Sequence, residues 1–292
     1  MKIGRVAVDG QICFVVEREG GLARVDSLVP AGGWREVLSA WARYEPVLQN
    51  APLVELPQGT VRWLVPLPDP PKFLLLAGNF RAHVVESGFA PLPEGVLTPQ
   101  FFIKPNSTLL GAVDPIPLVQ ANVALDYEAE LGIVMGKRLE RGATAEQALD
   151  AVWGYTVVND ISERKLNAGL EGRHKRSNDD FYDWLVGKWF DGSAPIGPWL
   201  VSKDEIASVD NLVIVARLNG EIVQQTPCSA MVHSIAEAIV YIAQVLTLEP
   251  GDIISMGTPS GVGFARGRLL QAGDLVECEI HGIGTLSNPV GA

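Results

Sequence analysis

The chain has 292 residues, of which 47% are hydrophobic and 20% charged, a composition typical of a folded soluble protein and not of a disordered or fibrous one. Its formal net charge of −11 at pH 7 excludes the basic surface that nucleic acids and anionic membranes need, so neither is expected as a partner. Cys13, Cys228 and Cys278 lie far apart, which argues against a disulfide scaffold or a thiolate zinc site and favours a reducing compartment.

Residues 1–65 alternate short β-like segments with one helical stretch, residues 33–49 (GWREVLSAWARYEPVLQ), and this pattern predicts a small N-terminal α+β domain. The Pro-rich segment 66–72 (PLPDPPK) predicts a linker, because proline fixes φ and disfavours helix and central strand. The N-terminus has no long apolar segment, and the apolar stretches elsewhere are shorter than the about 20 residues of a membrane span. We therefore expect a cytoplasmic protein.

From Phe73 onward the sequence is rich in strand-like segments, and residues 73–292 are predicted to form the main domain. One segment, residues 125–136 (LDYEAELGIVMG), carries three acids at alternate positions. In a strand these side chains, Asp126, Glu128 and Glu130, would share one face. That face is either a cation site or the solvated side of an antiparallel strand.

The next strand-like segment, residues 151–160 (AVWGYTVVND), ends in Asn159 and Asp160 and so adds a carboxylate at a strand terminus. The alternative interpretation is a turn-forming Asn-Asp pair. A set of carboxylates with no His or Cys nearby selects a hard cation, meaning Mg²⁺, Mn²⁺ or Ca²⁺ rather than zinc.

Residues 125–138 (LDYEAELGIVMGKR) and 154–164 (GYTVVNDISER), in this order, resemble the metal-binding signature of the fumarylacetoacetate hydrolase family. The resemblance covers residues 73–292. It implies a β-rich α+β fold with a mixed β-sandwich or roll as the catalytic domain, and a homodimer. It also implies that Mg²⁺ or Mn²⁺ is held by Glu128, Glu130 and Asp160, without Asp126.

Residues 78–88 (GNFRAHVVESG) place His83 and Glu86 three positions apart, which makes them neighbours on a helical turn. By itself such a pair fits a helix surface better than a catalytic site, and the resemblance reverses this interpretation. Family members with acylpyruvate activity carry an HxxE dyad at this place, so the resemblance implies that the pair activates water. Residues 187–201 (GKWFDGSAPIGPWLV) resemble a further family segment, in which the lysine, here Lys188, faces the metal and the substrate oxyanion.

Residues 251–263 (GDIISMGTPSGVG) lead into a glycine-rich loop that has neither the Walker A ending nor dinucleotide spacing. The resemblance implies that Thr258 in this loop, together with Arg164, binds the substrate carboxylate. The clearest helix begins at Ser234, with Glu237 at capping-box spacing.

Two features depart from the family pattern. Asn167 stands where the family commonly has Gln, and a polar insertion, residues 171–184 (EGRHKRSNDDFYDW), precedes Lys188. The insertion either is a solvated loop or brings further cations to the substrate, namely Arg173, Lys175 or Arg176.

We expect a metal-dependent hydrolase that cleaves a C–C bond in a β-diketo or acylpyruvate-type acid, such as acylpyruvate, fumarylpyruvate or a related aromatic-degradation intermediate. The metal would chelate the substrate, the His83 and Glu86 dyad would activate water, and Lys188 would stabilise the oxyanion. One alternative is a 2-oxo acid lyase on the same scaffold, either an oxaloacetate decarboxylase or a 2-oxo acid hydratase or decarboxylase. A further alternative is a non-catalytic Ca²⁺-binding β module.

Overall fold

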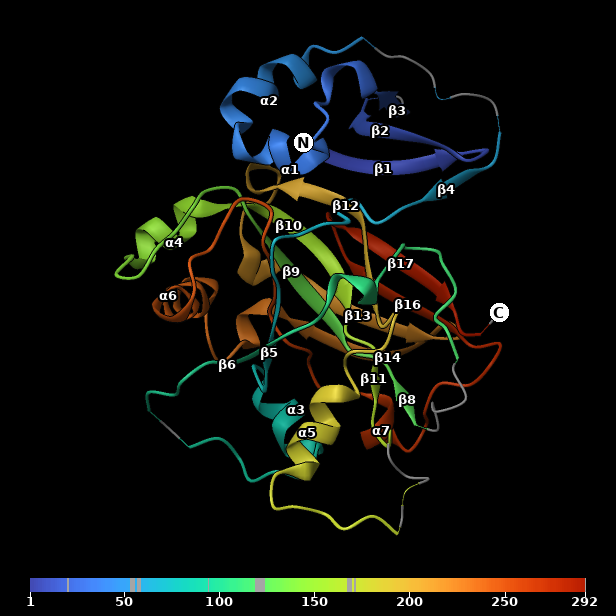
Figure 1. Cartoon of the computed structure of the whole chain (residues 1–292), viewed down its shortest axis with the longest axis vertical. Helices are drawn as coiled ribbons and strands as arrows, with labels where there is room; N and C mark the ends of the chain where they lie inside the picture. The colour runs from blue at the N-terminus through green and yellow to red at the C-terminus, as the bar shows by residue number, and fades with distance from the viewer. Residues whose placement is uncertain are drawn as a thin grey trace.

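The structure is a computed structural model that describes residues 1–19, 21–52, 56, 59–93, 95–118, 124–166, 170 and 172–291. Asn167 and the first residue of the 171–184 insertion lie outside these residues. Within them, a large sheet of eleven strands, a four-stranded sheet and a two-stranded ladder form a β-rich α+β fold (Figure 1). The predicted fold class is confirmed.

The large sheet has the order β3-β2-β1-β12-β10-β9-β15-β5-β6, with β4 paired to β1 and β7 paired to β12. Most neighbouring strands are antiparallel, but β5 is parallel to β15. The strands are β1 (Lys2–Val8), β2 (Gln11–Arg18), β3 (Gly21–Arg24), β4 (Val61–Trp63), β5 (Phe73–Ala77), β6 (Gln100–Ile103), β7 (Leu109–Leu110), β9 (Ala129–Met135), β10 (Val152–Asn159), β12 (Ala194–Ser202) and β15 (Ile253–Ser255).

The remaining elements pack around this sheet. The four-stranded sheet has the order β14 (Glu221–Pro227), β13 (Val213–Leu218), β16 (Leu275–Ile280) and β17 (Gly284–Pro289), and the ladder pairs β8 (Leu125–Asp126) with β11 (Ser162–Glu163). The α-helices are α1 (Gly33–Ser39), α2 (Trp41–Gln49), α3 (Arg81–Glu86), α4 (Ala145–Ala151), α5 (Asp179–Val186), α6 (Ile235–Val245) and α7 (Gly263–Arg266). Short 3-10 turns span Asp26–Leu28, Asn106–Thr108, Lys203–Glu205, Val209–Asn211 and Cys228–Ala230.

The central strands are buried on both faces. In β5, Phe73 and Leu75 belong to one apolar cluster, whereas Leu74 and Leu76 belong to another on the opposite side. Side chains alternate between the two faces of a strand, so a strand covered on both sides reads as a continuous apolar run. This explains why β5 is apolar throughout.

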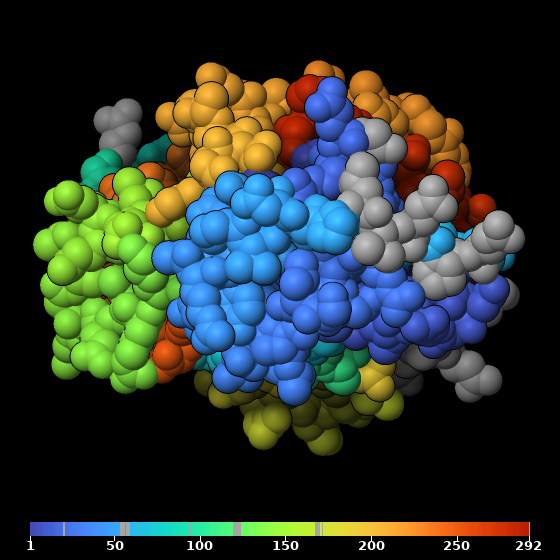
Figure 2. All heavy atoms as spheres, turned by 90° about the horizontal axis from the view of Figure 1, so that it is seen from above, coloured from blue at the N-terminus to red at the C-terminus, as the bar shows by residue number. Residues whose placement is uncertain are grey.

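The N-terminal strands extend the large sheet, because β1 pairs with β2 on one side and with β12 on the other. In Figure 2, which views the molecule from above, the blue N-terminal residues lie in the middle of the face toward the viewer. The single helix predicted over residues 33–49 is wrong: the chain forms α1 and α2, separated at Ala40, whose φ of −130° is not helical. The domain boundary at residues 66–72 stays a prediction.

The strand predicted over residues 125–136 is also interrupted. β8 pairs with β11 and β9 pairs with β10, while Tyr127 and Glu128 lie between β8 and β9. The backbone N–H of Asp160 donates to the carbonyl of Glu128 at 2.8 Å across the interruption. The interruption therefore brings Glu128 beside the end of β10.

Helix α6 begins as predicted. The Ser234 side chain accepts from the Glu237 N–H, and the Glu237 side chain accepts from the Ser234 N–H, which makes a complete capping box. Helices α4 and α6 lie against each other on one flank of the sheet (Figure 1). Among the described residues, no helix is long and apolar enough to cross a membrane. The cytoplasmic location stays a prediction.

Candidate active site

Three carboxylates meet in the interior of the protein. Glu128, Glu130 and Asp160 each offer an oxygen, and these oxygens all lie within 4.8 Å of one another. The three residues are only 4%, 1% and 1% exposed. The alternative interpretation of the acidic segment, a solvated strand face, is therefore wrong. Asp126 is also buried but does not belong to this group.

Each carboxylate is positioned by a different element. Glu130 lies in β9, and its Oε2 accepts from the Ser255 hydroxyl at 2.5 Å and from the Gly257 N–H at 3.0 Å. Asp160 directly follows β10. Glu128 lies at the interruption, where its N–H donates to Oδ1 of Asn159 at 3.0 Å. The buried backbone groups of the strand ends are thus used to orient the acids.

Two lysines face the cluster. Nζ of Lys188 donates to Oε2 of Glu128 at 2.7 Å and to Oδ2 of Asp160 at 2.6 Å. Lys188 is 2% exposed, so these contacts are made away from water. Nζ of Lys104 donates to the other oxygen of Asp160 at 2.6 Å. The sequence interpretation missed Lys104, which directly follows β6 and is 1% exposed.

The two glutamates of the cluster have pKa values that are shifted in opposite directions. Burial acts to raise the pKa of Glu128, but the nearby Lys188 ammonium and Arg164 guanidinium outweigh it and hold that pKa well below its usual range. For Glu130, burial and then the charges of Asp160 and Glu128 raise the pKa well above its usual value. A cation placed among the three acids would relieve this repulsion.

Arg164 is fixed between two acids. Its Nε donates to Oδ2 of Asp126 at 2.9 Å, and its Nη2 donates to Oε1 of Glu128. Asp126 in turn accepts from the N–H groups of Gly263 at 2.7 Å and Phe264 at 3.1 Å, at the start of α7. The Nη1 nitrogen is not used in these bonds, so the guanidinium keeps donors for a substrate carboxylate. Binding of substrate by Arg164 stays a prediction.

The predicted His-Glu pair lies on α3. Nδ1 of His83 is 2.9 Å from Oε1 of Glu86, and the other oxygen of Glu86 accepts from the Gly261 N–H at 2.8 Å. Gly261 has a φ of +107°, and a Cβ there would lie 2.0 Å from the carbonyl oxygen of Val223. Glycine is therefore required where the loop holds Glu86. His83 adds to Lys188 and Arg164 in lowering the pKa of Glu128 against the effect of burial, so the dyad lies near the cluster.

Thr258 has a structural role as well as a predicted one. Its hydroxyl donates to the Ala129 carbonyl at 3.0 Å and accepts from Nε2 of Gln224 at 2.9 Å. Gln224 also accepts from the Ala129 N–H at 3.1 Å, so it fastens the glycine-rich loop to β9. A direct bond from Thr258 to a substrate carboxylate would require its donor to leave Ala129, and it stays a prediction.

The cluster fits the divalent ion that the sequence predicts. All three donors are carboxylates, which suits Mg²⁺, Mn²⁺ or Ca²⁺ and not a thiolate-preferring metal. The side-chain nitrogen of Asn159 has no hydrogen-bond partner among the described residues, although it is buried next to Asp160. A hydrogen-bond donor is thus unused, among the described residues, beside the predicted metal ligands.

A cavity of about 300 Å³ adjoins the cluster. Its walls include Lys188 and Arg164, which both contact Glu128. The other lining residues are Ser162, Glu163, Lys165, Leu166, Arg173, Lys175, Asp180, Asp183 and Trp184.

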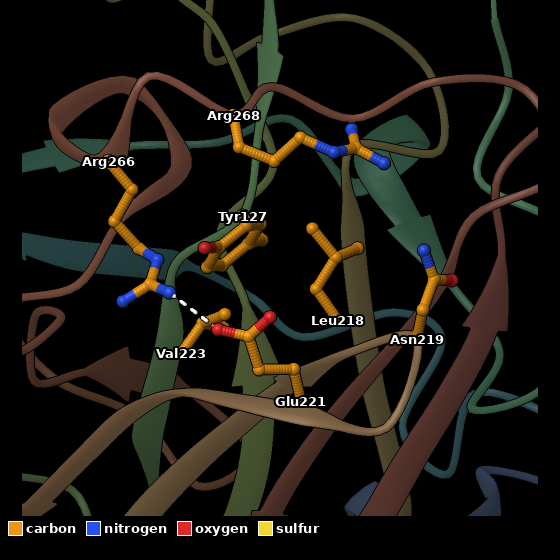
Figure 3. Close-up of a pocket in the computed structure, with 7 residues that line it drawn as sticks. All are labelled: Tyr127, Leu218, Asn219, Glu221, Val223, Arg266 and Arg268. Atoms are coloured by element: carbon orange, nitrogen blue, oxygen red, sulfur yellow. Dashed lines mark hydrogen bonds and ion pairs between the residues drawn. The ribbon is translucent and has the colours of Figure 1, made fainter.

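A second cavity, of about 490 Å³, lies by Tyr127 and α7 (Figure 3). There Arg266 and Arg268 point apart and pair with Glu221 and Asp274. The smaller cavity is the better candidate substrate site, because Lys188 and Arg164 in its walls contact the carboxylate cluster.

The described part of the polar insertion is ordered around α5. Its three cations form ion pairs with acids of the same helix: Arg173 with Asp183, Lys175 with Asp180 and Arg176 with Asp179. Arg173 and Lys175 line the 300 Å³ cavity, and Arg176 does not.

Known proteins resemble the chain over most of its length. A mitochondrial oxaloacetate tautomerase of Xenopus laevis is 37% identical over 237 residues, which are 80% of this chain and 70% of that protein. The oxaloacetate tautomerase of Bacillus subtilis is 40% identical over 236 residues, covering 79% of this chain and 73% of its own.

Solved structures align over the whole chain. A 5-carboxymethyl-2-hydroxymuconate delta-isomerase from Mycobacterium smegmatis has a TM-score of 0.73 at 28% identity, covering 100% of this chain and 98% of its own. A maleylpyruvate hydrolase from a Sphingobium species, solved with manganese(II) and pyruvate, has a TM-score of 0.78 at 24% identity and covers 100% and 99%. The latter likeness is one of fold.

These names favour the 2-oxo acid alternative of the sequence interpretation over its main expectation, C–C bond hydrolysis. Tautomerisation itself was not among the predicted reactions. Residues 72–291 match the family described as fumarylacetoacetate (FAA) hydrolase C-terminal. The chain therefore belongs to the fumarylacetoacetate hydrolase family.

Proposed function

We propose that the protein catalyses the metal-assisted keto–enol tautomerisation of a 2-oxo acid, with oxaloacetate as the first substrate to test. One observation carries the proposal: a buried set of hard-cation ligands is in direct contact with the ammonium of Lys188. Such a site stabilises an enolate, which is the species common to tautomerisation and decarboxylation of 2-oxo acids. The names of the relatives support tautomerisation between these two.

Glu128, Glu130 and Asp160 would hold Mg²⁺ or Mn²⁺, with Ca²⁺ as a third possibility. When bound, the ion supplies positive charge that lowers the energy of an enolate. Lys188 lies against two of these carboxylates and would face the same developing charge. Arg164 would hold the carboxylate of the substrate through its free Nη1 donors, with Thr258 as a second predicted contact.

His83 would move the proton. Its Nδ1 faces Glu86, which leaves Nε2 to exchange a proton with the substrate. In the direction from ketone to enol, a proton leaves C3 and the oxygen at C2 is protonated, so atoms and charge balance. Glu86, fixed by the Gly261 N–H, would keep the ring in the orientation that this transfer needs.

The test starts from enol oxaloacetate and follows its ketonisation by the loss of enol absorbance, with Mg²⁺, with Mn²⁺ and with a chelator. The proposal predicts a metal-dependent rate well above the buffer rate. Acetylpyruvate and fumarylpyruvate are assayed alongside for hydrolysis, and the release of CO₂ from oxaloacetate is measured. A kcat/KM for hydrolysis or decarboxylation above that for tautomerisation would overturn the proposal.

Hydrolysis of an acylpyruvate-type acid is the second candidate, and the His83 and Glu86 pair is the observation that favours it. A histidine ring bonded to a carboxylate is also suited to take a proton from water. If hydrolysis occurs, His83→Ala should abolish it and leave decarboxylation of oxaloacetate in place. The remaining alternative, a structural Ca²⁺ module, predicts metal binding without turnover of any 2-oxo acid.

A further inference from the structure

The cavity beside the metal ligands has a buried floor and an exposed rim. At the floor, the side chains of Lys188 and Arg164 are 3% and 14% exposed. At the rim, those of Arg173 and Lys175 are 25% and 58% exposed. Cations thus line the cavity from the cluster outward to solvent.

The two sets of cations differ in what they face. Arg164 and Lys188 contact the acids of the cluster or Asp126. Arg173 and Lys175 instead contact Asp183 and Asp180 of α5, in ion pairs that solvent reaches. Partly exposed pairs of this kind contribute little to stability, so the rim cations can turn to a bound anion at low cost.

The charge of the lining also favours an anion. Five of its side chains are cationic and three are acidic, in a chain whose net charge is −11. An acidic protein that binds a dianion needs such a local excess of positive charge. The lining therefore has a buried group of cations and a partly exposed group, which suits a ligand with two carboxylates.

We propose that Arg173, assisted by Lys175, binds the far carboxylate of a dicarboxylic 2-oxo acid and so determines substrate specificity. The inference rests on the proposed function, because the near end of the same acid would lie at Arg164 and the metal ligands. The guanidinium of Arg173 would exchange Asp183 for the substrate carboxylate and form two parallel hydrogen bonds with it.

The experiment compares acids of equal chain length that differ only in the far carboxylate. Oxaloacetate is paired with 2-oxobutanoate, and 2-oxoadipate with 2-oxohexanoate. Enolisation is measured as solvent-deuterium exchange at C3 by NMR, with Mn²⁺-free Mg²⁺ buffer. Wild-type protein should exchange the dicarboxylic member of at least one pair with a kcat/KM about tenfold higher or more.

Arg173→Ala should remove this preference by raising KM for the dicarboxylic acid about tenfold while kcat changes little. The KM and kcat for the monocarboxylic acid should also change little. Arg176→Ala is the matched control, because Arg176 forms the same kind of pair with α5 but lies outside the cavity. Asp183→Asn keeps the cation and weakens its internal pair, so it should retain or increase the preference.

Three results would overturn the subsite: no preference in wild type, equal losses on both members of a pair in Arg173→Ala, or the same loss in Asp183→Asn as in Arg173→Ala. The last result would mean that the ion pair only supports α5. Failure of the proposed function is separate, since it would appear as no metal-dependent exchange of any of the four acids by wild-type protein.

Discussion

Nζ of Lys188 lies 2.6 Å from Oδ2 of Asp160, and both side chains are almost fully buried. The same ammonium donates to Glu128, so one cation neutralises two of the three acids that are proposed to hold the metal. We therefore propose two roles for Lys188: it stabilises the acids in the absence of metal, and it would supply positive charge where an enolate forms.

Replacing Lys188 by methionine should therefore affect stability and catalysis separately. Without metal, the variant loses the buried cation that Glu128 and Asp160 share and leaves Arg164 and Lys104 as their remaining partners. Breaking a buried ion pair costs about 3–5 kcal/mol. Thermal unfolding in a chelator should show a lower Tm than wild type, and Mg²⁺ should raise the Tm of the variant more than that of wild type. With metal bound, kcat should fall about 10²–10³-fold.

Lys137→Met is the matched control, because Lys137 pairs with Asp150 at the surface, where both side chains are more than half exposed. It should change neither Tm nor kcat appreciably. A Lys188→Met protein that melts like wild type in chelator would contradict the stabilising role.

His83→Ala should lower kcat for tautomerisation about 10²–10⁴-fold, the usual contribution of a general acid–base group. Glu86→Gln should cause a smaller loss, since it removes the charge but keeps a hydrogen-bond acceptor for the ring. Neither residue belongs to the carboxylate cluster, so the Kd for Mn²⁺ should be unchanged in both. Steady-state kinetics and Mn²⁺ titration check this; a parallel loss of metal affinity would assign the dyad to the metal site.

Ser255→Ala should weaken metal binding although it replaces none of the three predicted metal ligands. The Ser255 hydroxyl donates to Oε2 of Glu130 at 2.5 Å, and residues that orient metal ligands typically contribute about 10–100-fold in affinity. Calorimetric titration with Mg²⁺ or Mn²⁺ measures the change. Ser234→Ala, which removes a hydroxyl at the remote cap of α6, should leave the affinity at its wild-type value.

Glu237→Ala should lower stability more at neutral pH than in acid. The Ser234 N–H and hydroxyl bond the Glu237 carboxylate and lower its pKa in the folded protein. The contribution is therefore present above the unfolded value of 4.5 and is lost as the pH falls through the lower folded value. The free energy of unfolding should drop by about 1 kcal/mol at pH 7, and the difference from wild type should shrink as the pH falls through the folded pKa. A difference that does not shrink in acid would contradict the linkage.

The three clustered carboxylates could be identified because their signal is local and occurs in motifs that resemble the family; that they bind metal stays a prediction. Glu128 and Glu130 stand two residues apart, Asp160 ends the next strand, and the capping box of α6 is complete in four residues. The interruption of the strand at Tyr127 and Glu128 could not be predicted, because it depends on the pairing of β8 with β11, which comes from the fold.

The supporting residues were missed for a related reason. Lys104 reaches Asp160 across 56 positions of the chain, and Ser255 reaches Glu130 across 125. No sequence periodicity connects residues so far apart. The reaction was also not determined by the motifs, because the proposed role of the acids and Lys188 in stabilising an enolate is common to several reactions of 2-oxo acids.

The central claim is that Glu128, Glu130 and Asp160 hold one divalent ion. The most direct measurement is a titration with Mn²⁺ in which EPR detects the free ion, on wild-type, Glu130→Gln and Asp160→Asn proteins. Wild type should bind one Mn²⁺ per chain, and both variants should lose this site while Lys137→Met keeps it. Equal Mn²⁺ binding by wild type and both acid variants would contradict the account.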